Sequence, residues 1–162
     1  DLVRPVPVEK AVFIIRQLVS ALVYAHDKGV IHCDIKPTNI LLTEKGVPKL
    51  TDWGLARSDL SRWPVWGFSP RYAAPEQRQN PPECGGGTDI WQTGMVFTEL
   101  ITGRAAVPGG TEPVFQAEIG SHILQIIRKC LQENPEGRYP SARALIADLD
   151  LISGTESSSD PV

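Results

Sequence analysis

The feature that most restricts how this chain can fold is the segment of residues 88–101. Its apolar residues recur at the three- and four-residue steps of a helix, but they cover much of the helix circumference. A helix of this kind is stable only when other elements surround it. We therefore expect a buried central helix in one domain, because 162 residues are enough for one substantial core and too few for two independent ones.

Further segments have the spacing of helices that could pack around this centre. Residues 8–28 carry apolar side chains at helical steps, and Gly29 follows as a typical residue after a helix C-terminus. Two more helices are predicted at residues 122–131 and from an N-cap at Ser141 to Ile152. Short apolar pieces predict small strands at residues 30–31, 40–42 and 49–51. The predicted fold class is α+β, mostly helical with a few short strands.

Two other segments lack a regular period. Residues 52–77 contain Gly, Ser and three prolines, which is typical of a long irregular segment kept for function. Residues 153–162 are polar and rich in serine, and we expect them to form a disordered tail. The predicted organisation is one domain over residues 1–152 followed by this tail.

Charge and cysteine content exclude several classes of protein. The formal net charge of −3 offers no basic field to a phosphate backbone, so we expect no nucleic-acid partner. No apolar run is long enough to predict a membrane segment. Cys33, Cys84 and Cys130 are odd in number and widely spaced, and none falls in a pair that resembles a zinc or redox motif. The default expectation is a reduced, cytoplasmic location.

Four side chains within nineteen positions have the chemistry that phosphoryl transfer needs. The loop of residues 32–39 (His-Cys-Asp-Ile-Lys-Pro-Thr-Asn) contains Asp34, Lys36 and Asn39, and Asp52 follows in Asp-Trp-Gly. Asp34 can orient an attacking hydroxyl and accept its proton, and Lys36 can balance charge on the transferred phosphoryl group. Asn39 and Asp52 offer hard oxygen ligands for Mg²⁺. Taken alone, each aspartate is more often a turn residue than a functional one.

The motifs taken together resemble those of eukaryotic-type (Hanks-type) serine/threonine protein kinases. Residues 32–39 are similar to the catalytic loop H-R-D-x-K-P-x-N, residues 52–54 to D-F-G, and residues 74–76 (Ala-Pro-Glu) to A-P-E. Asp89 resembles the family's helix aspartate that holds the catalytic-loop backbone, and Arg138 the arginine that pairs with the A-P-E glutamate. Ser69 stands where the family has a hydroxyl residue that contacts the catalytic Asp and Lys.

The resemblance implies that Asp34 and Lys36 are catalytic, that Lys36, Asn39 and Asp52 bind ATP, and that Asn39 and Asp52 hold Mg²⁺. It also implies the helical C-terminal lobe of the kinase fold alone. The Gly-rich loop, strand lysine and partner glutamate of the N-terminal lobe have no counterpart, so this lobe is expected as a missing partner from the same chain. The 162 residues alone are expected to have negligible activity.

Two departures from the family pattern qualify its functional meaning. Cys33 replaces the usual arginine, so a phosphorylated activation segment could not be bound through that contact. Trp53 replaces the usual phenylalanine, and its indole N–H needs a partner if it is buried. A zinc site built from His26, His32 and Cys33 is a remote alternative for these residues.

The sequence leaves two main functions to weigh. The leading hypothesis is a protein serine/threonine kinase that transfers the ATP γ-phosphate to Ser or Thr hydroxyls of a protein substrate. The alternative is a pseudokinase-like binding module that holds a partner without catalysis. A small-molecule phosphotransferase with a similar loop is a third possibility, which the Ala-Pro-Glu motif and Arg138 make less favourable.

Overall fold

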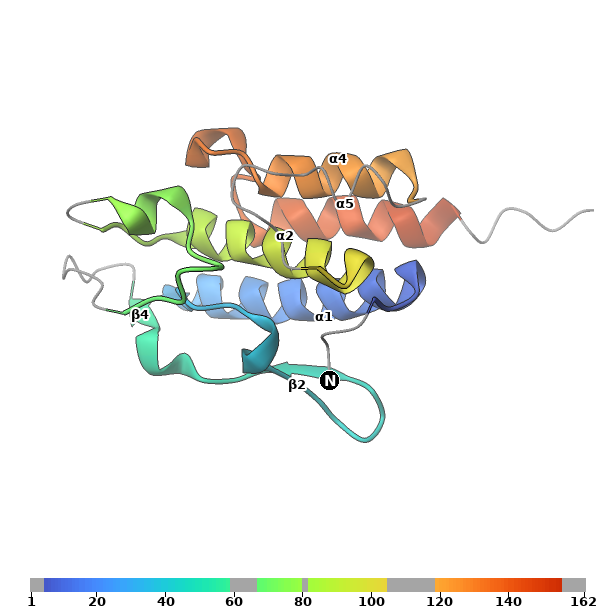
Figure 1. Ribbon diagram of the computed structural model, residues 1–162, viewed down its shortest axis with the longest axis horizontal. Coiled ribbons are helices and arrows are strands. Elements are labelled where there is room, and N and C mark those ends of the chain that lie inside the picture. The colour runs from blue at the N-terminus through green and yellow to red at the C-terminus, as the bar shows by residue number, and fades with distance from the viewer. Residues whose placement is uncertain (1–4, 59–66, 80–81, 105–118, 156–162) are drawn as a thin grey trace, which may run out of the picture.

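The computed structural model describes residues 5–58, 67–79, 82–104 and 119–155. For residues 153–155 it describes the backbone alone. Over these residues, four α-helices run side by side in layers, and the short strands lie on the side of α1 (Figure 1). The helices are α1 (Val8–Asp27), α2 (Gly86–Thr102), α4 (Ser121–Cys130) and α5 (Ala142–Thr155). This arrangement confirms the expected α+β class, mostly helical with a few short strands.

Helix α2 is the buried centre that its all-round apolar surface predicts. It packs against both α1 and α4. Every residue from Thr88 to Ile101 is buried, and Ile90, Trp91 and Phe97 are each 1% exposed. A Cβ atom added at Gly94 would lie 2.7 Å from the Cβ of Cys130, so this glycine lets α4 approach the backbone of α2.

Helix α1 buries one face and exposes the other, as its spacing predicts. Ile14, Ile15, Leu18 and Leu22 are at most 2% exposed and belong to the main core. Gly29 follows the helix with a φ of +69°, in the left-handed conformation typical of a residue after a helix C-terminus.

The last helix is longer than the sequence predicts. The Oγ of Ser141 accepts a hydrogen bond from the backbone N–H of Ala144 at 3.2 Å, which confirms the predicted N-cap. Helix α5 then continues to Thr155, three residues into the predicted disordered tail. No proline occurs between Ser141 and Pro161, so no residue in this stretch lacks a backbone N–H donor. Residues 156–162 of the predicted tail lie outside the described residues.

Two antiparallel pairs of short strands flank the loop that carries the predicted site. Strand β1 (Val30–Ile31) pairs with β4 (Arg57–Ser58), with Ile31 opposite Arg57. Strand β2 (Ile40–Leu42) pairs with β3 (Pro48–Leu50), with Ile40 opposite Leu50. The predicted β1 and β2 are confirmed, and β3 begins one residue earlier than expected. Strand β4 was not predicted, because Arg57 and Ser58 are polar and do not form a short apolar piece like those that predicted the other strands.

The structure corrects one expectation about the cysteines. Cys33 and Cys84 form a disulfide bond, although they are 51 residues apart and their spacing matches no redox motif. Their Cα atoms lie 6.2 Å apart, within the range that a disulfide can bridge. Cys130 is free and buried. Sequence spacing missed the bond because only the packing of the loop at Cys33 against the segment before α2 brings the two residues together.

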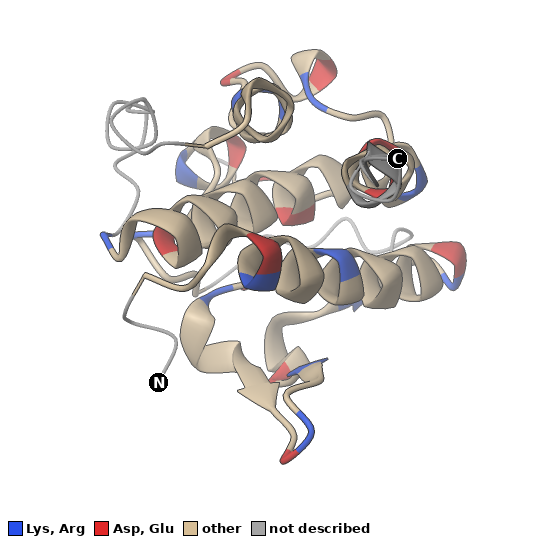
Figure 2. Ribbon diagram, turned by 90° about the vertical axis from the view of Figure 1, so that its right-hand side faces the viewer, with Lys and Arg blue, Asp and Glu red and all other residues tan. Residues whose placement is uncertain are grey.

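Charged residues of both signs are interspersed over the helices and the β2–β3 hairpin (Figure 2). Glu44 and Lys45, for example, are neighbours in the exposed hairpin turn. Over the described ranges, no helix has the length and apolar character needed to cross a membrane.

Candidate functional site

The strand pairing brings two loops next to each other. Residues 32–39 connect β1 to β2, and residues 51–56 connect β3 to β4. Since β1 pairs with β4 and β2 with β3, the two loops share both ends. The backbone N–H of Thr51 donates to the carbonyl of Asn39 at 2.8 Å, which joins the loops directly beside Asp52. The predicted site residues of both loops therefore belong to one region.

The side chain of His32 also links the same two loops. Its Nδ1 accepts the backbone N–H of Asp34 at 3.3 Å, so the other ring nitrogen, Nε2, is assigned the proton and donates to the carbonyl of Thr51 at 3.0 Å. The rings of His32 and Trp53 lie 4.6 Å apart. Trp53 is exposed, so its indole N–H is not in the buried position for which a partner was expected to be necessary; it nevertheless donates to the carbonyl of Leu50 at 3.2 Å.

The carboxylate of Asp34 is the centre of a polar cluster. Lys36 Nζ donates to Asp34 Oδ2 at 2.7 Å and to Ser69 Oγ at 2.8 Å. The backbone N–H of Ser69 donates to Asp34 Oδ1 at 3.1 Å. The amide of Asn39 donates to the Asp34 carbonyl at 2.9 Å and, at 3.4 Å, to its Oδ2. The structure thus brings together three of the four predicted residues, with Ser69 where the resemblance implies.

The surroundings of Asp34 keep it ionised. Burial would raise the pKa of this carboxyl, but the hydrogen bonds from Lys36 and Ser69 and the positive charge of Lys36 outweigh it. The pKa of Asp34 is therefore lowered from its usual value of 3.8. At neutral pH the group is a carboxylate that can accept a hydrogen bond from a hydroxyl. Its Oδ1 has a second lone pair for that purpose beside the bond from Ser69, whereas Oδ2 already accepts from Lys36 and Asn39.

Asp52 stands apart from this cluster but directly after Thr51, at the end of the second loop. Its side chain is exposed, and its Oδ1 would lie 3.3 Å from a Cβ added at Gly54. The glycine therefore leaves room for the carboxylate.

The donor set at Asn39 and Asp52 fits a magnesium ion. Because Asn39 uses its Nδ2 on Asp34, its Oδ1 is directed elsewhere as an acceptor. Carboxylate and amide oxygens, completed by water and phosphate oxygens, are the ligands that Mg²⁺ prefers. The two residues are joined through the hydrogen bond between Thr51 and Asn39, which holds the two loop ends together.

Both loops contain a residue with strained backbone. Among the described non-glycine residues, positive φ angles occur at Cys33 (68°) and Asp52 (59°). Such conformations cost about 1–3 kcal/mol and persist where the surroundings enforce them, often at functional sites. Cys33 directly precedes Asp34, so the two strained residues lie at the two predicted aspartates.

Polar side chains from α2 enforce the conformation of the first loop. The carboxylate of Asp89 accepts the backbone N–H groups of His32 at 2.9 Å and of Cys33 at 2.8 Å. Asp89 is fully buried, and His26 Nε2 lies 2.8 Å from its Oδ2. This is the loop-holding role that the resemblance implies for Asp89.

Two buried glutamines in this support were missed by the sequence analysis. Gln77 Nε2 and Gln92 Nε2 both donate to the carbonyl of Cys33, at 2.9 and 3.0 Å. Gln92 Oε1 accepts the N–H of Ile35 at 2.7 Å. Gln92 lies three residues after Asp89 on α2, so helical spacing could have placed it on the same face. No local pattern marks Gln77.

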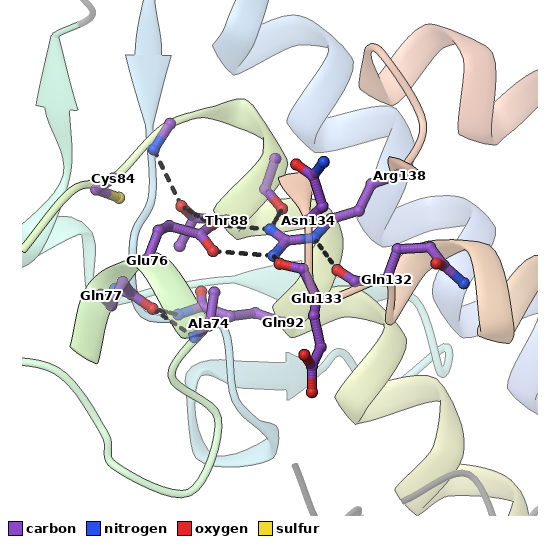
Figure 3. Close-up of polar contacts among 12 residues, drawn as sticks. Ala74, Glu76, Gln77, Cys84, Thr88, Gln92, Gln132, Glu133, Asn134 and Arg138 are labelled. Carbon is purple, nitrogen blue, oxygen red and sulfur yellow. Dashed lines mark hydrogen bonds and ion pairs between the residues drawn. The ribbon is translucent and has the colours of Figure 1, made fainter. Parts of the chain in front are cut away.

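The expected ion pair between Glu76 and Arg138 is confirmed and forms part of a buried network (Figure 3). The guanidinium donates to both Glu76 carboxylate oxygens, at 2.8 and 2.9 Å, and to the carbonyls of Gly87, Gln132 and Glu133. Thr88 Oγ1 donates to Glu76 Oε1 at 2.9 Å. This network fixes the Ala-Pro-Glu segment against the start of α2.

The residues considered for zinc have separate partners. His26 contacts Asp89, His32 contacts Thr51, and Cys33 is in the disulfide bond. In the part of the chain that the structure describes, no three His, Cys, Asp or Glu side chains gather in a way that could hold a metal ion.

Comparison with known proteins agrees with the geometry. The family model described as protein kinase domain matches residues 3–149. Serine/threonine-protein kinase PkaA of Streptomyces coelicolor is 32% identical over 160 residues, covering 88% of this chain and 29% of that protein. A probable serine/threonine-protein kinase of Clostridium perfringens is 35% identical over 168 residues, covering 90% and 24%. RUNKEL, a serine/threonine-protein kinase of Arabidopsis thaliana, is 46% identical over 91 residues, covering 54% and 7%. This chain therefore spans less than a third of the length of each of these relatives.

Proposed function

Because this chain belongs to the protein kinase domain family, we propose that it is the helical lobe of a serine/threonine protein kinase that transfers the γ-phosphoryl group of ATP to a protein hydroxyl. One observation carries the proposal: an ionised, 4% exposed Asp34 contacts Lys36, Asn39 and Ser69 beside the loop that bears Asp52. The bacterial relatives that cover most of the chain support serine or threonine acceptors by their names.

The residues divide the work of an in-line transfer. Asp34 aligns the substrate hydroxyl and accepts its proton as the new bond forms. Lys36, already 2.7 Å from Asp34 Oδ2, balances negative charge between this carboxylate and the transferred group. Asn39 and Asp52 are the proposed ligands of Mg²⁺. When bound there, Mg²⁺ would supply charge neutralisation at the phosphate oxygens of ATP.

We propose that a smaller lobe of the same protein completes the ATP site and that residues 1–152 correspond to the helical lobe. The match of the family model to residues 3–149 supports this boundary. The proposed location is the cytoplasm, where ATP, Mg²⁺ and protein substrates occur together. A protein substrate with a Ser or Thr acceptor is the proposed partner.

The test uses the complete protein that includes the smaller lobe, with Mg²⁺, labelled ATP and a general protein substrate. We expect Asp52→Ala to reduce phosphate transfer by at least about 100-fold, since it removes a metal ligand. Glu44→Ala is the matched control, because it removes an exposed acid from the neighbouring hairpin turn and should leave the rate unchanged. Transfer that survives in Asp52→Ala at the wild-type rate would refute the proposal.

A further inference from the structure

The Cys33–Cys84 disulfide connects the first loop, which bears Asp34, to the segment that precedes α2. Cys33 immediately precedes Asp34 in the first loop, and Cys84 lies two residues before α2. No contact of Asp34 or Asp52 depends on either sulfur atom. The bond therefore has a role outside the proposed transfer reaction, and its chemistry can be considered separately.

Hydrogen bonds that do not involve sulfur hold Cys33 in place. Its N–H donates to Asp89 Oδ1 at 2.8 Å, and its carbonyl accepts from Gln77 Nε2 at 2.9 Å and Gln92 Nε2 at 3.0 Å. All three partner side chains are at most 1% exposed. Cleavage of the disulfide would leave these contacts intact.

The neighbours of Cys84 are held in the same way. The N–H of Glu83 donates to the carbonyl of Glu76 at 3.1 Å, and the N–H of Gly85 donates to Thr88 Oγ1 at 3.0 Å. Figure 3 shows Cys84 beside this network of Glu76, Thr88 and Arg138. Because the backbone of Cys33 and the residues on both sides of Cys84 are anchored, two free thiols would remain close enough to form the bond again.

The two sulfur-bearing residues differ in access to solvent. Cys33 is fully buried, whereas Cys84 is half-buried at the surface. Among the described residues, Cys84 is therefore the side of the disulfide that a thiol in solution can approach. Cys130 provides an internal comparison: it is 1% exposed, and burial raises the pKa of its thiol to about 12, so it has little reactive thiolate.

We propose that Cys33 and Cys84 form a reversible thiol–disulfide exchange site for small thiols of the glutathione class, with Cys84 as the attacked residue. A glutathione thiolate bonds to Cys84 Sγ as the Cys84–Cys33 bond breaks, and the electron pair leaves on Cys33 Sγ, which takes a proton from water. A second glutathione thiolate then attacks the glutathione sulfur of the mixed disulfide and releases Cys84 as a thiolate. The protein disulfide is reduced to two thiols while two glutathione molecules are oxidised to glutathione disulfide. Glutathione disulfide, as the oxidant, drives the reverse reaction.

The test maps cysteine chemistry in the complete protein. The protein is equilibrated with glutathione disulfide, exposed to a limiting amount of reduced glutathione, quenched with acid, and analysed by peptide mass spectrometry. We expect a cross-linked Cys33–Cys84 peptide before reduction and a mixed disulfide on Cys84 during it. After full reduction and before unfolding, N-ethylmaleimide should label Cys84 at least 10-fold faster than Cys130.

Two variants distinguish the roles of the two cysteines. In Cys33→Ser, glutathione disulfide should trap glutathione on Cys84, whereas in Cys84→Ser the buried Cys33 should be modified at least 10-fold more slowly. Circular dichroism first establishes that each variant is folded. If either variant is unfolded, the peptide mapping of the wild-type protein alone tests the proposal. Absence of the cross-linked peptide, or a mixed disulfide found on Cys33 at an equal rate, would overturn the proposal. Neither outcome depends on kinase activity.

Discussion

Replacing Asp34 with Asn in the complete protein should lower kcat for phosphate transfer by about 10²- to 10⁴-fold, the usual contribution of a general base. The substitution keeps the size of the side chain and the hydrogen bond from the N–H of Ser69, but it removes the charge that faces Lys36. Because Asp34 is not one of the proposed ligands of Mg²⁺ or ATP, KM for ATP should change far less than kcat. Steady-state kinetics separates the two constants.

Asp150→Asn is the matched control for this variant. Asp150 lies on the surface of α5 and pairs with Arg16 of α1. The same chemical change at Asp150 should leave kcat unaltered. The lowered pKa of Asp34 also predicts that its ionisation does not limit the rate near neutral pH, and that activity falls only when acid protonates it. A variant Asp34→Asn with wild-type kcat would remove Asp34 from the mechanism.

Replacing Arg138 with Met should lower the free energy of unfolding by about 3–5 kcal/mol. Arg138 is 3% exposed, and its loss leaves the buried Glu76 carboxylate without its counter-ion and three backbone carbonyls without this donor. Urea-induced unfolding followed by circular dichroism measures the change. Arg16→Met is the control: the Arg16–Asp150 pair is more than two-fifths exposed on both sides and should contribute about 0–1 kcal/mol.

The effect of Arg138→Met should depend on pH in a defined direction. Burial would raise the pKa of Glu76, but the hydrogen bonds and charge of Arg138 outweigh it and lower the pKa below 4.5. A carboxyl whose pKa is lowered by folding stabilises the fold above its unfolded pKa, and this contribution is lost as pH falls through the folded value. The difference in stability between wild type and Arg138→Met should therefore shrink in acid. A difference that stays constant or grows would contradict this assignment of Glu76.

The sequence predicts the helices well because the buried side chains of a helix recur every three to four residues, and this spacing is visible in the local sequence. In α1 the apolar side chains of Ile14, Ile15, Leu18 and Leu22 recur at helical steps and are all buried. The same reasoning places α2 at the centre. It fails for β4, whose two residues pair with β1 only because the chain returns there from 26 residues away.

The candidate site divides in the same way. Asp34, Lys36 and Asn39 are close in sequence, and the motif spacing predicts their proximity. The contribution of Gln77, Gln92 and the disulfide partner Cys84 depends on long-range packing against the first loop, which no local pattern records. Local sequence therefore predicts the residues that act in the site better than the residues that position it.

The most direct measurement of the central proposal is paramagnetic broadening by Mn²⁺, which can take the place of Mg²⁺ with ATP. In the complete protein, labelled with ¹⁵N at asparagine and aspartate, addition of Mn²⁺ and ATP should broaden the backbone amide signals of Asn39 and Asp52 first. The amide of Asp150 on α5 should remain sharp and serves as the reference. Broadening of Asp150 alone, or unchanged signals for Asn39 and Asp52 at saturating ATP, would contradict a metal–nucleotide site at these two loops.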